Sequence, residues 1–411
     1  MSKIQFFRNT AVALAVAGPL TAAMATNGYF SHGYGMKAKG MGGAAVAMTD
    51  NAFAGANNPA VAAYAGNRME LGLDLFMPDR TASRTGNSTA ALNGTYESDD
   101  TLFYVPEFGY NRTVNDKVSV GLTVYGNGGM NTNYPASSTN LLNGAGRLGV
   151  DLMQLIVAPT VAYKLDANQS LGVSPLLVYQ KFKADGLNGF GISNGTGYDS
   201  SSGIGVRVGY LGKFGDRWTI GASYAPKVNM SKFDKYKGLF AEQGDFDIPE
   251  NYTLGFSFAA TPAVTLALDY QKISYSGVAA IANPSANILS GASLGANNGP
   301  GFGWTDVNVL KLGVEWKKSP VLTLRAGFNV GDNPVKSSDT TFNILAPGVV
   351  TRHYTLGGTY AVSGNSELTV AYMYAPENSV SGATLGAIAG GGTETLKMSQ
   401  QSLGIQFGWK Y

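Results

Sequence analysis

The chain has 411 residues, 44% of them hydrophobic and only 14% charged, with a formal net charge of +2 and no cysteine. The lack of cysteine excludes disulfides and thiolate metal sites, and the near-neutral charge offers no basic field for nucleic acid. No window holds about 18 uninterrupted apolar residues, which excludes a bundle of membrane-spanning helices. Because the chain is instead rich in glycine, tyrosine and phenylalanine, its composition favours strands with aromatic belts.

The N-terminus has the pattern of a secretory signal peptide. Lys3 and Arg8 precede an apolar run at residues 11–17, and Ala23-Met24-Ala25 supplies an A-x-A cleavage site. This apolar run is far shorter than the roughly 20 residues that span a bilayer as a helix. We therefore expect residues 1–25 to be removed, which leaves 27 of the 29 basic residues against 27 acidic ones.

Residues 26–68 form a second segment, which is rich in glycine, alanine and methionine. Asn58-Pro59-Ala60 predicts the start of a helix, with Asn58 as the N-cap, Pro59 at the first helical position and Gly66 as the stop. The segment is too long for a linker, so we expect a separate piece ahead of residues 69–411.

From residue 69 onward, apolar and polar side chains alternate with a period of two, which is typical of β-strands with two unlike faces. The last segment shows this most clearly, because Leu403, Ile405, Phe407, Trp409 and Tyr411 share one face. Such runs predict fourteen strands, at residues 69–77, 101–112, 117–126, 150–164, 169–183, 202–213, 217–228, 249–260, 263–275, 304–316, 321–330, 351–362, 366–375 and 397–411.

The connections between these strands alternate between six short turns, such as Asn115-Asp116 and Thr261-Pro262, and seven long stretches. Outer-membrane barrels have an even number of strands, short periplasmic turns and long extracellular loops. The sequence therefore predicts an all-β protein, a 14-stranded antiparallel transmembrane β-barrel of the Gram-negative outer membrane, with both termini in the periplasm. A soluble β-sandwich also alternates, but it explains neither the signal peptide nor the turn asymmetry.

Charged residues in the strands lie on the faces opposite the apolar ones. A lysine or arginine that faced lipid near the bilayer midplane would cost roughly 2–4 kcal/mol. We therefore expect these residues to face the lumen and to pair with one another and with residues 26–68, which would act as a hatch, or plug. They are Glu70, Asp74, Arg207, Asp269, Lys311, Glu315, Arg325 and Glu367.

The glycine-rich stretch through Gly40-Met41-Gly42-Gly43, the Asn58-Pro59-Ala60 motif, Val105-Pro106 and the Asn115-Asp116 turn together resemble the outer-membrane transporters of long-chain fatty acids and aromatic hydrocarbons, the FadL and TodX family. The resemblance covers the whole mature chain. It implies a monomer without a cofactor that captures a hydrophobic molecule on extracellular loops, passes it by the hatch and releases it sideways through the barrel wall.

Two long loops are the candidate capture groove. Phe233, Tyr236 and Phe240 recur at helical spacing between Ser231 and Gly244, and the neighbouring loop supplies Leu187, Phe190 and Ile192. The resemblance implies that these loops bind substrate, whereas a helix packed on the barrel rim is the alternative. The nearby Lys232, Lys235 and Lys237 could attract either a carboxylate or the phosphates of lipopolysaccharide.

Gly126, Gly128 and Gly129 end the third predicted strand, where glycines weaken the ladder and permit a kink. The resemblance implies lateral exit at this kink, and an ordinary strand-to-loop transition is the alternative. Gly126 stands where fatty acid transporters of the family have a serine that helps hold the carboxylate. Lys181 and Lys183 are the candidates for basic pocket residues, and the departure at Gly126 leaves an uncharged aromatic hydrocarbon as the alternative substrate.

Other functions find little support in the sequence. His32 and His353 are the only histidines, so a metal cluster is disfavoured, and the Ser-His-acid triad of an outer-membrane lipase would need one of these two. The hatch disfavours a hydrophilic porin. The expected partners are the hydrophobic substrate, outer-membrane lipid with lipopolysaccharide, and the barrel-insertion machinery, which would recognise the aromatic C-terminal strand.

Overall fold

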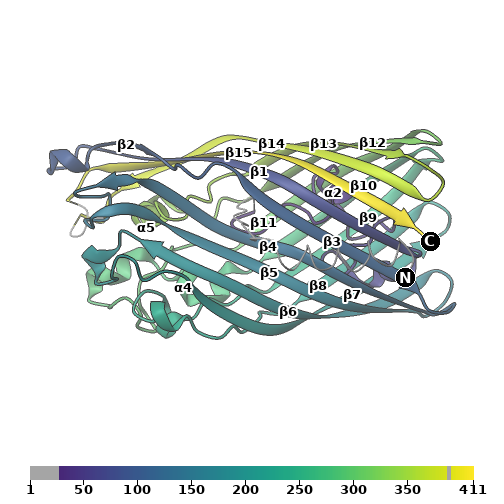
Figure 1. The fold of residues 1–411 in the computed structure, drawn as a ribbon, viewed down its shortest axis with the longest axis horizontal. Helices are drawn as coiled ribbons and strands as arrows, with labels where there is room; N and C mark the ends of the chain where they lie inside the picture. The colour runs from purple at the N-terminus through teal and green to yellow at the C-terminus, as the bar shows by residue number, and fades with distance from the viewer. Residues whose placement is uncertain (1–26, 387–389) are drawn as a thin grey trace, which may run out of the picture.

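A computed structural model describes residues 27–386 and 390–411, so the predicted signal peptide lies outside the described residues. The fold is a closed antiparallel β-barrel (Figure 1). Each barrel strand pairs with its neighbours in chain order, and the first and last strands close the barrel from Arg68 opposite Lys410 to Thr85 opposite Thr393. The predicted fold class and the count of fourteen barrel strands are confirmed.

The barrel strands are β1 (Arg68–Thr85), β3 (Phe103–Thr113), β4 (Val118–Ser137), β5 (Gly146–Lys164), β6 (Gln169–Asp185), β7 (Asp199–Phe214), β8 (Trp218–Ala225), β9 (Asn251–Thr261), β10 (Val264–Ile273), β11 (Val307–Ser319), β12 (Leu322–Gly331), β13 (Arg352–Ala361), β14 (Ser366–Ala383) and β15 (Thr393–Lys410). All six predicted short turns are present, and they lie at the end of the barrel that holds the C-terminus (Figure 1).

The alternation of side chains decides which face of each strand meets lipid. On β15, Leu403, Ile405 and Phe407 are 43–47% exposed on the outside, whereas Ser402 and Gln406 between and beside them are at most 3% exposed toward the lumen. The eight charged strand residues predicted to face the lumen are all 8% exposed or less. That prediction is confirmed.

Several strands are longer than predicted, at the end of the barrel that carries the long loops. β1 continues to Thr85, β4 to Ser137 and β14 to Ala383, with a register shift between Ala375 and Asn378. A short additional strand, β2 (Gly94–Glu97), pairs with residues 81–84 of β1. These extensions carry polar side chains on both faces, so a search for apolar alternation ended each strand too early.

The remaining elements are short helices, and no described helix is both long and apolar enough to cross a membrane. Those in the hatch are α2 (Met36–Lys39) and η1 (Pro59–Ala63); those in the long loops are η2 (Ala90–Leu92), η3 (Asn188–Phe190), η4 (Asp234–Tyr236), α3 (Ala241–Gly244), η5 (Tyr275–Gly277), α4 (Ala279–Ala282), η6 (Ser285–Ser290), η7 (Ser337–Asp339) and α5 (Thr340–Asn343).

Residues 27–67 lie inside the barrel and nearly all of them are buried, and we call this segment the hatch. Asn58 is the N-cap of η1, as predicted, because its side chain accepts a hydrogen bond from the Ala60 amide at 3.0 Å. The helix is a 3-10 helix that ends at Ala63, so Gly66 is not its immediate stop. A Cβ on Gly209 of β7 would lie 2.0 Å from the Asn58 side chain, and only glycine leaves room for this contact.

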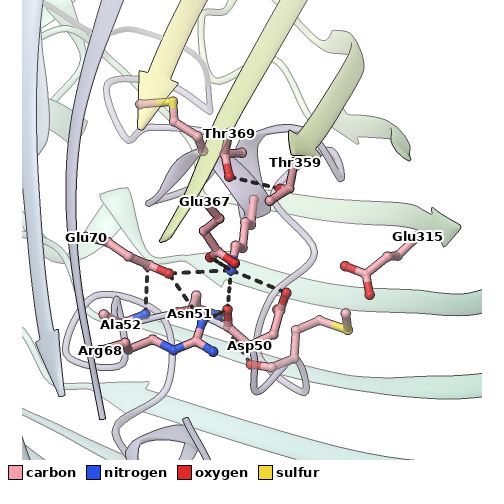
Figure 2. Close-up of polar contacts among 12 residues, drawn as sticks. Asp50, Asn51, Ala52, Arg68, Glu70, Glu315, Thr359, Glu367 and Thr369 are labelled. Carbon is pink, nitrogen blue, oxygen red and sulfur yellow. Dashed lines mark hydrogen bonds and ion pairs between the residues drawn. The ribbon is translucent and has the colours of Figure 1, made fainter. Parts of the chain in front are cut away.

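Ion pairs hold the hatch against the barrel wall. Asp50, Glu70 and Glu367 converge on one point (Figure 2), and the Lys37 ammonium lies within 3.6 Å of a carboxylate oxygen of each. A second hatch lysine, Lys39, lies between two carboxylates of the wall. The expectation that lumen charges pair with one another and with the hatch is confirmed.

Candidate functional site

The barrel wall is interrupted between β3 and β4. The ladder between these strands runs from Thr113 opposite Ser119 only as far as Phe108 opposite Val124. Beyond that point β3 continues to pair with β1, and β4 continues to pair with β5 with a register shift between Gly126 and Gly128. One edge of β4 therefore lacks a strand partner at the predicted kink.

The hatch supplies the missing partner from the lumen side. The Ser31 amide donates to the Asn127 carbonyl at 3.2 Å, and the Gly129 amide donates to the Tyr29 carbonyl at 3.1 Å. A Cβ on Gly128 would lie only 1.7 Å from the Tyr29 oxygen, so this approach requires glycine. The first described residues of the hatch thus close the gap in the wall.

A cavity lies in the wall at this gap, and we call it the wall cavity. It encloses about 400 Å³, part of it open to solvent. Its lining combines lumen-facing residues with outward-facing ones such as Tyr179, which is 45% exposed, so the cavity lies within the thickness of the wall. The lining residues are Val105, Pro106, Gly126, Met153, Gln154, Leu155, Tyr179 and Lys181.

A second cavity, the inner cavity, lies on the lumen side of the same kink. Its empty space is about 300 Å³, which includes space open to solvent, and Gly129 and Met130 of β4 border it. Its lining is apolar apart from a few groups, of which Arg80 of β1 is the only charged one. The lining residues are Phe76, Pro78, Arg80, Gly129, Met130, Asn131, Trp304, Ala346, Pro347, Gly348 and Met398.

A third cavity, the loop cavity, lies among the long loops, and its empty space is about 480 Å³, part of it open to solvent. Phe342 and Leu345 line it, and the adjoining residues Ala346 to Gly348 line the inner cavity, so one segment borders both. Its lining residues are Leu142, Val150, Phe182, Leu187, Phe190, Leu239, Phe240, Ala280, Leu294, Pro300, Gly301, Phe302, Phe342 and Leu345.

Three of the predicted capture residues, Leu187, Phe190 and Phe240, line the loop cavity. Phe233 and Tyr236 are fully buried behind it, where they contact the ring of Phe182 with centroids at 5.8 and 4.8 Å. Ile192 is half-buried and packs against the same apolar cluster.

The predicted helix through residues 233–240 is wrong. The chain forms only the 3-10 turn η4 there, and the short α3 that follows holds Glu242 and Gln243 in left-handed conformations. Spacings of three and four residues place Phe233, Tyr236 and Phe240 together because all three pack on Phe182, not because they share a helix face.

The predicted basic residues lie away from the lumen. Lys181 and Lys183 point outward from β6, with their ammonium groups 4.6 and 5.5 Å from the Tyr198 ring centre. Strand alternation explains this, because Gln180 and Phe182 take the lumen face. Neither lysine can act as a lumen pocket residue, although Lys181 borders the wall cavity.

Lys232, Lys235 and Lys237 are exposed, and two of these lysines bind backbone carbonyls. Lys232 donates to the Glu242 carbonyl at 2.6 Å and Lys235 donates to the Tyr198 carbonyl at 2.7 Å. Lys237 is likewise exposed. None of the three borders the loop cavity, so their charges lie on the outer surface of the loop.

The two histidines meet between the hatch and β13. The rings of His32 and His353 stack at 5.8 Å, and both are fully buried. Burial lowers the pKa of the His32 imidazole well below its ordinary value, and the nearby His353, Lys39 and Lys311 add to this effect. The neutral ring therefore fits the docked hatch. Among residues 27–386 and 390–411, no cluster of three potential metal ligands occurs.

Sequence reasoning missed several residues of the cavities. Phe182, Trp304 and Phe342 come from segments far apart in the chain, and no local pattern brings them together. Arg80 lies in the part of β1 beyond the predicted strand end. Continuing the alternation from Glu70 and Asp74 to Arg80 and Arg84 would have placed both arginines on the lumen face.

A closed barrel of fourteen strands with a hatch in its lumen is an outer-membrane architecture of Gram-negative bacteria. The sequence model of the family described as outer membrane protein transport protein (OMPP1/FadL/TodX) matches residues 12–411, so the chain belongs to this family. The protein is thus an outer-membrane transport protein. A comparison with curated protein sequences gave no match.

Solved structures of similar fold cover almost the whole chain. The Pseudomonas putida toluene transporter TodX aligns with a TM-score of 0.69 and 18% identity over 92% of this chain and 99% of its own. A Pseudomonas aeruginosa FadL homologue aligns with a TM-score of 0.70 and 15% identity, covering 93% and 99%. The Ralstonia pickettii toluene transporter TbuX aligns with a TM-score of 0.65 and 18% identity, covering 92% and 99%. These likenesses establish the fold.

Proposed function

We propose that the protein takes up hydrophobic small molecules, in the first place long-chain fatty acids. The loop cavity captures the molecule, the inner cavity receives it beside the hatch, and the wall cavity releases it sideways into the outer membrane. Both termini lie in the periplasm, and the loops face outward. Each buried CH₂ contributes about 0.8 kcal/mol, so apolar cavities of this kind can draw an alkyl chain out of water.

The observation that carries this proposal is the gap between β3 and β4. A porin needs an open lumen and a continuous wall, whereas here the hatch fills the lumen and the wall ladder ends at Phe108 and Val124. The inner and wall cavities lie on either side of the glycine-rich kink, next to Gly129 and Gly126 respectively. This arrangement supports a sideways path.

A second candidate substrate is an uncharged aromatic hydrocarbon, taken up by the same route. Gly126 stands in place of the serine expected from the fatty acid transporters, and two proteins of similar fold, TodX and TbuX, are toluene transporters. Polar groups in the lining of the wall cavity at Gly126 are limited to the side chains of Gln154, Tyr179 and Lys181.

Growth of a deletion strain on limiting oleate, and separately on toluene, tests the function. Loss of growth on one substrate alone assigns the substrate class. Unchanged growth on both, in a strain without a second family member, contradicts uptake.

Liposome swelling tests the porin alternative with the purified protein. We expect slow swelling in sugars, because the hatch fills the lumen. Rapid swelling would show a water-filled pore and contradict the proposed route.

A further inference from the structure

The end of the barrel that carries the six short turns has a surplus of positive charge (Figure 1). We call the charged residues of these turns and of the adjoining strand ends the turn rim, apart from Lys410, which pairs with Glu367 at 3.0 Å. Its cations, all exposed or half-buried, are Arg112, Lys117, Lys164, Lys213, Arg217, Lys317 and Lys318. Its carboxylates are Asp116, Asp166 and Asp216. Because the chain after residue 25 has as many cations as carboxylates, the part outside the turn rim is acidic.

The cations of the turn rim lack acidic partners, unlike many of those at the end with the long loops. At the loop end, five cations form ion pairs with carboxylates at 2.5–3.4 Å; they are Arg147, Lys183, Lys227, Lys272 and Lys397. Among residues 27–386 and 390–411, no cation of the turn rim forms an ion pair. The Asp166 carboxylate instead accepts hydrogen bonds from two amides of its own turn, at 2.7 and 2.8 Å. The positive charge of the turn rim is therefore not neutralised within the described chain.

Three of these cations lie beside the part of the barrel that faces lipid. The Lys117 ammonium lies 5.9 Å from the ring centre of Tyr163, and the Lys318 ammonium lies 5.9 Å from that of Trp316. Both rings are on the outside of the barrel, 45% and 44% exposed. Arg112 of β3 also points outward, because the residue before it is buried on the lumen side. Tyrosine and tryptophan rings of barrels lie at the membrane–water interface, so these three cations lie at the level of the lipid headgroups.

The distribution of the charges favours a membrane surface over a protein partner. The cations come from four of the six turns, those that follow β3, β5, β7 and β11, so they are spread around the barrel. A globular protein would meet only some of these turns at once, whereas lipid headgroups surround the barrel. A headgroup whose phosphate has no counter-charge of its own would be attracted most strongly, because the ammonium of a zwitterionic headgroup is repelled.

We infer that the turn rim binds anionic phospholipids through their phosphate groups. In the proposed orientation of the barrel, these lipids belong to the inner leaflet of the outer membrane. A cation close to an anionic membrane surface strengthens binding roughly fivefold. Binding of these lipids does not depend on the proposed uptake of hydrophobic molecules.

Quenching of tryptophan fluorescence by brominated lipid tests the inference on the full chain in bilayers. Trp218, Trp316 and Trp409 lie on the outside near the turn rim, whereas Trp304, the fourth tryptophan, is buried. Bilayers that mix brominated phosphatidylglycerol with unbrominated phosphatidylcholine report which lipid contacts the three outer rings. At low salt we expect phosphatidylglycerol to be preferred about fivefold. The preference should vanish at about 0.5 M salt, where charges are screened over roughly 4 Å.

A triple variant removes the three cations at the headgroup level, with the changes Arg112→Gln, Lys117→Gln and Lys318→Gln. Its preference for phosphatidylglycerol should fall to within about twofold of equal contact. The matched control removes the same charge from the loop end, with Lys232→Gln, Lys235→Gln and Lys237→Gln. This control should keep the wild-type preference, because its substitutions lie far from the three outer tryptophans.

Equal contact of the wild type with both lipids would overturn the inference and leave an acidic protein as the better partner for the turn rim. An undiminished preference in a folded triple variant would also overturn it, and so would a preference of the wild type that high salt leaves unchanged. Inorganic phosphate, added at constant ionic strength, should leave the preference intact. Loss of the preference under that condition would show a site for free phosphate in place of a membrane-binding surface.

Discussion

Replacing Gly128 by alanine should detach the first residues of the hatch from the barrel wall. The new Cβ would lie 1.7 Å from the Tyr29 carbonyl oxygen and 2.8 Å from its carbon, and real Cβ atoms do not approach so closely. The backbone of β4 is held on its other side by β5, with Gly128 opposite Gln154. The hatch segment must therefore move.

The expected size of the effect follows from the contacts that would be lost. The segment is joined to β4 by hydrogen bonds from Ser31 to the Asn127 carbonyl, from Gly129 to the Tyr29 carbonyl and from the Tyr34 hydroxyl to the Asn127 carbonyl, at 3.2, 3.1 and 3.0 Å. At a net contribution of about 1 kcal/mol each, their loss amounts to about 3 kcal/mol. Since 1.4 kcal/mol is a factor of ten, the detached state should become roughly 100-fold more populated.

Hydrogen exchange measures this population directly. Peptides that cover residues 27–34 and 125–131 should exchange roughly 100-fold faster in Gly128→Ala than in the wild type. Gly358→Ala in β13 is the control, because its Cβ would meet no atom closer than 3.8 Å. Wild-type exchange rates in a correctly folded Gly128→Ala barrel would refute the view that the hatch completes the wall at this position.

Four further substitutions and one change of pH test other parts of the structure. Lys39→Met would leave two buried wall carboxylates, which Lys39 contacts at 2.7 and 2.8 Å, without a counter-charge. The hatch should lose about 3–5 kcal/mol of docking stability, measured as faster proteolysis of the hatch. Unaltered proteolysis would contradict a tethering role of Lys39. Lowering the pH below 6.5 should loosen the hatch, because docking lowers the pKa of the His32 imidazole. The stability that the neutral ring contributes is complete above the ordinary pKa of histidine and declines as the pH falls toward the lowered pKa. His32→Gln should weaken the pH dependence of hydrogen exchange in the hatch, and an identical pH profile would contradict this role of His32. Phe182→Ala removes the ring on which Phe240 and its aromatic neighbours pack, which should cost about 3–5 kcal/mol of local stability. Ligand binding at the loop cavity, measured by calorimetry, should become weaker. Lys183→Gln should leave this binding affinity unchanged, because the Lys183 side chain points away from the lumen. A loss of affinity would show that the outward-facing lysine contributes to ligand binding.

The barrel could be predicted from the sequence because lipid imposes a strict local pattern. On β15, the side chains that face lipid must be apolar, as Leu403, Ile405 and Phe407 are, whereas Gln406 faces the lumen and can be polar. The short turns are also determined by a few neighbouring residues. Outside the membrane this constraint ends, which is why the extension of β1 through Arg80 was not anticipated.

The candidate site depends instead on contacts between distant segments. Tyr29 binds Gly129 across 100 residues, and Trp304 and Met130 line the same cavity from distant parts of the chain, so no local spacing indicates either arrangement. Local spacing even misled at Phe233, Tyr236 and Phe240, where three residues that meet on one ring imitate the period of a helix. The hatch motif was recognisable because its N-cap is a local arrangement.

The pairing of the β4 edge with hatch residues has a consequence for the permeability of the membrane. A strand edge in hydrocarbon costs several kcal/mol for each backbone group left without a partner, and here the hatch residues Tyr29 and Ser31 satisfy those groups. On the proposed route, opening of the gap without a bound ligand would leave these backbone groups unpaired in hydrocarbon, which favours the closed arrangement. On the proposed sideways route, the outer membrane would therefore stay closed to small polar molecules between transport events, because the hatch residues that close the gap are a detachable part of the sheet.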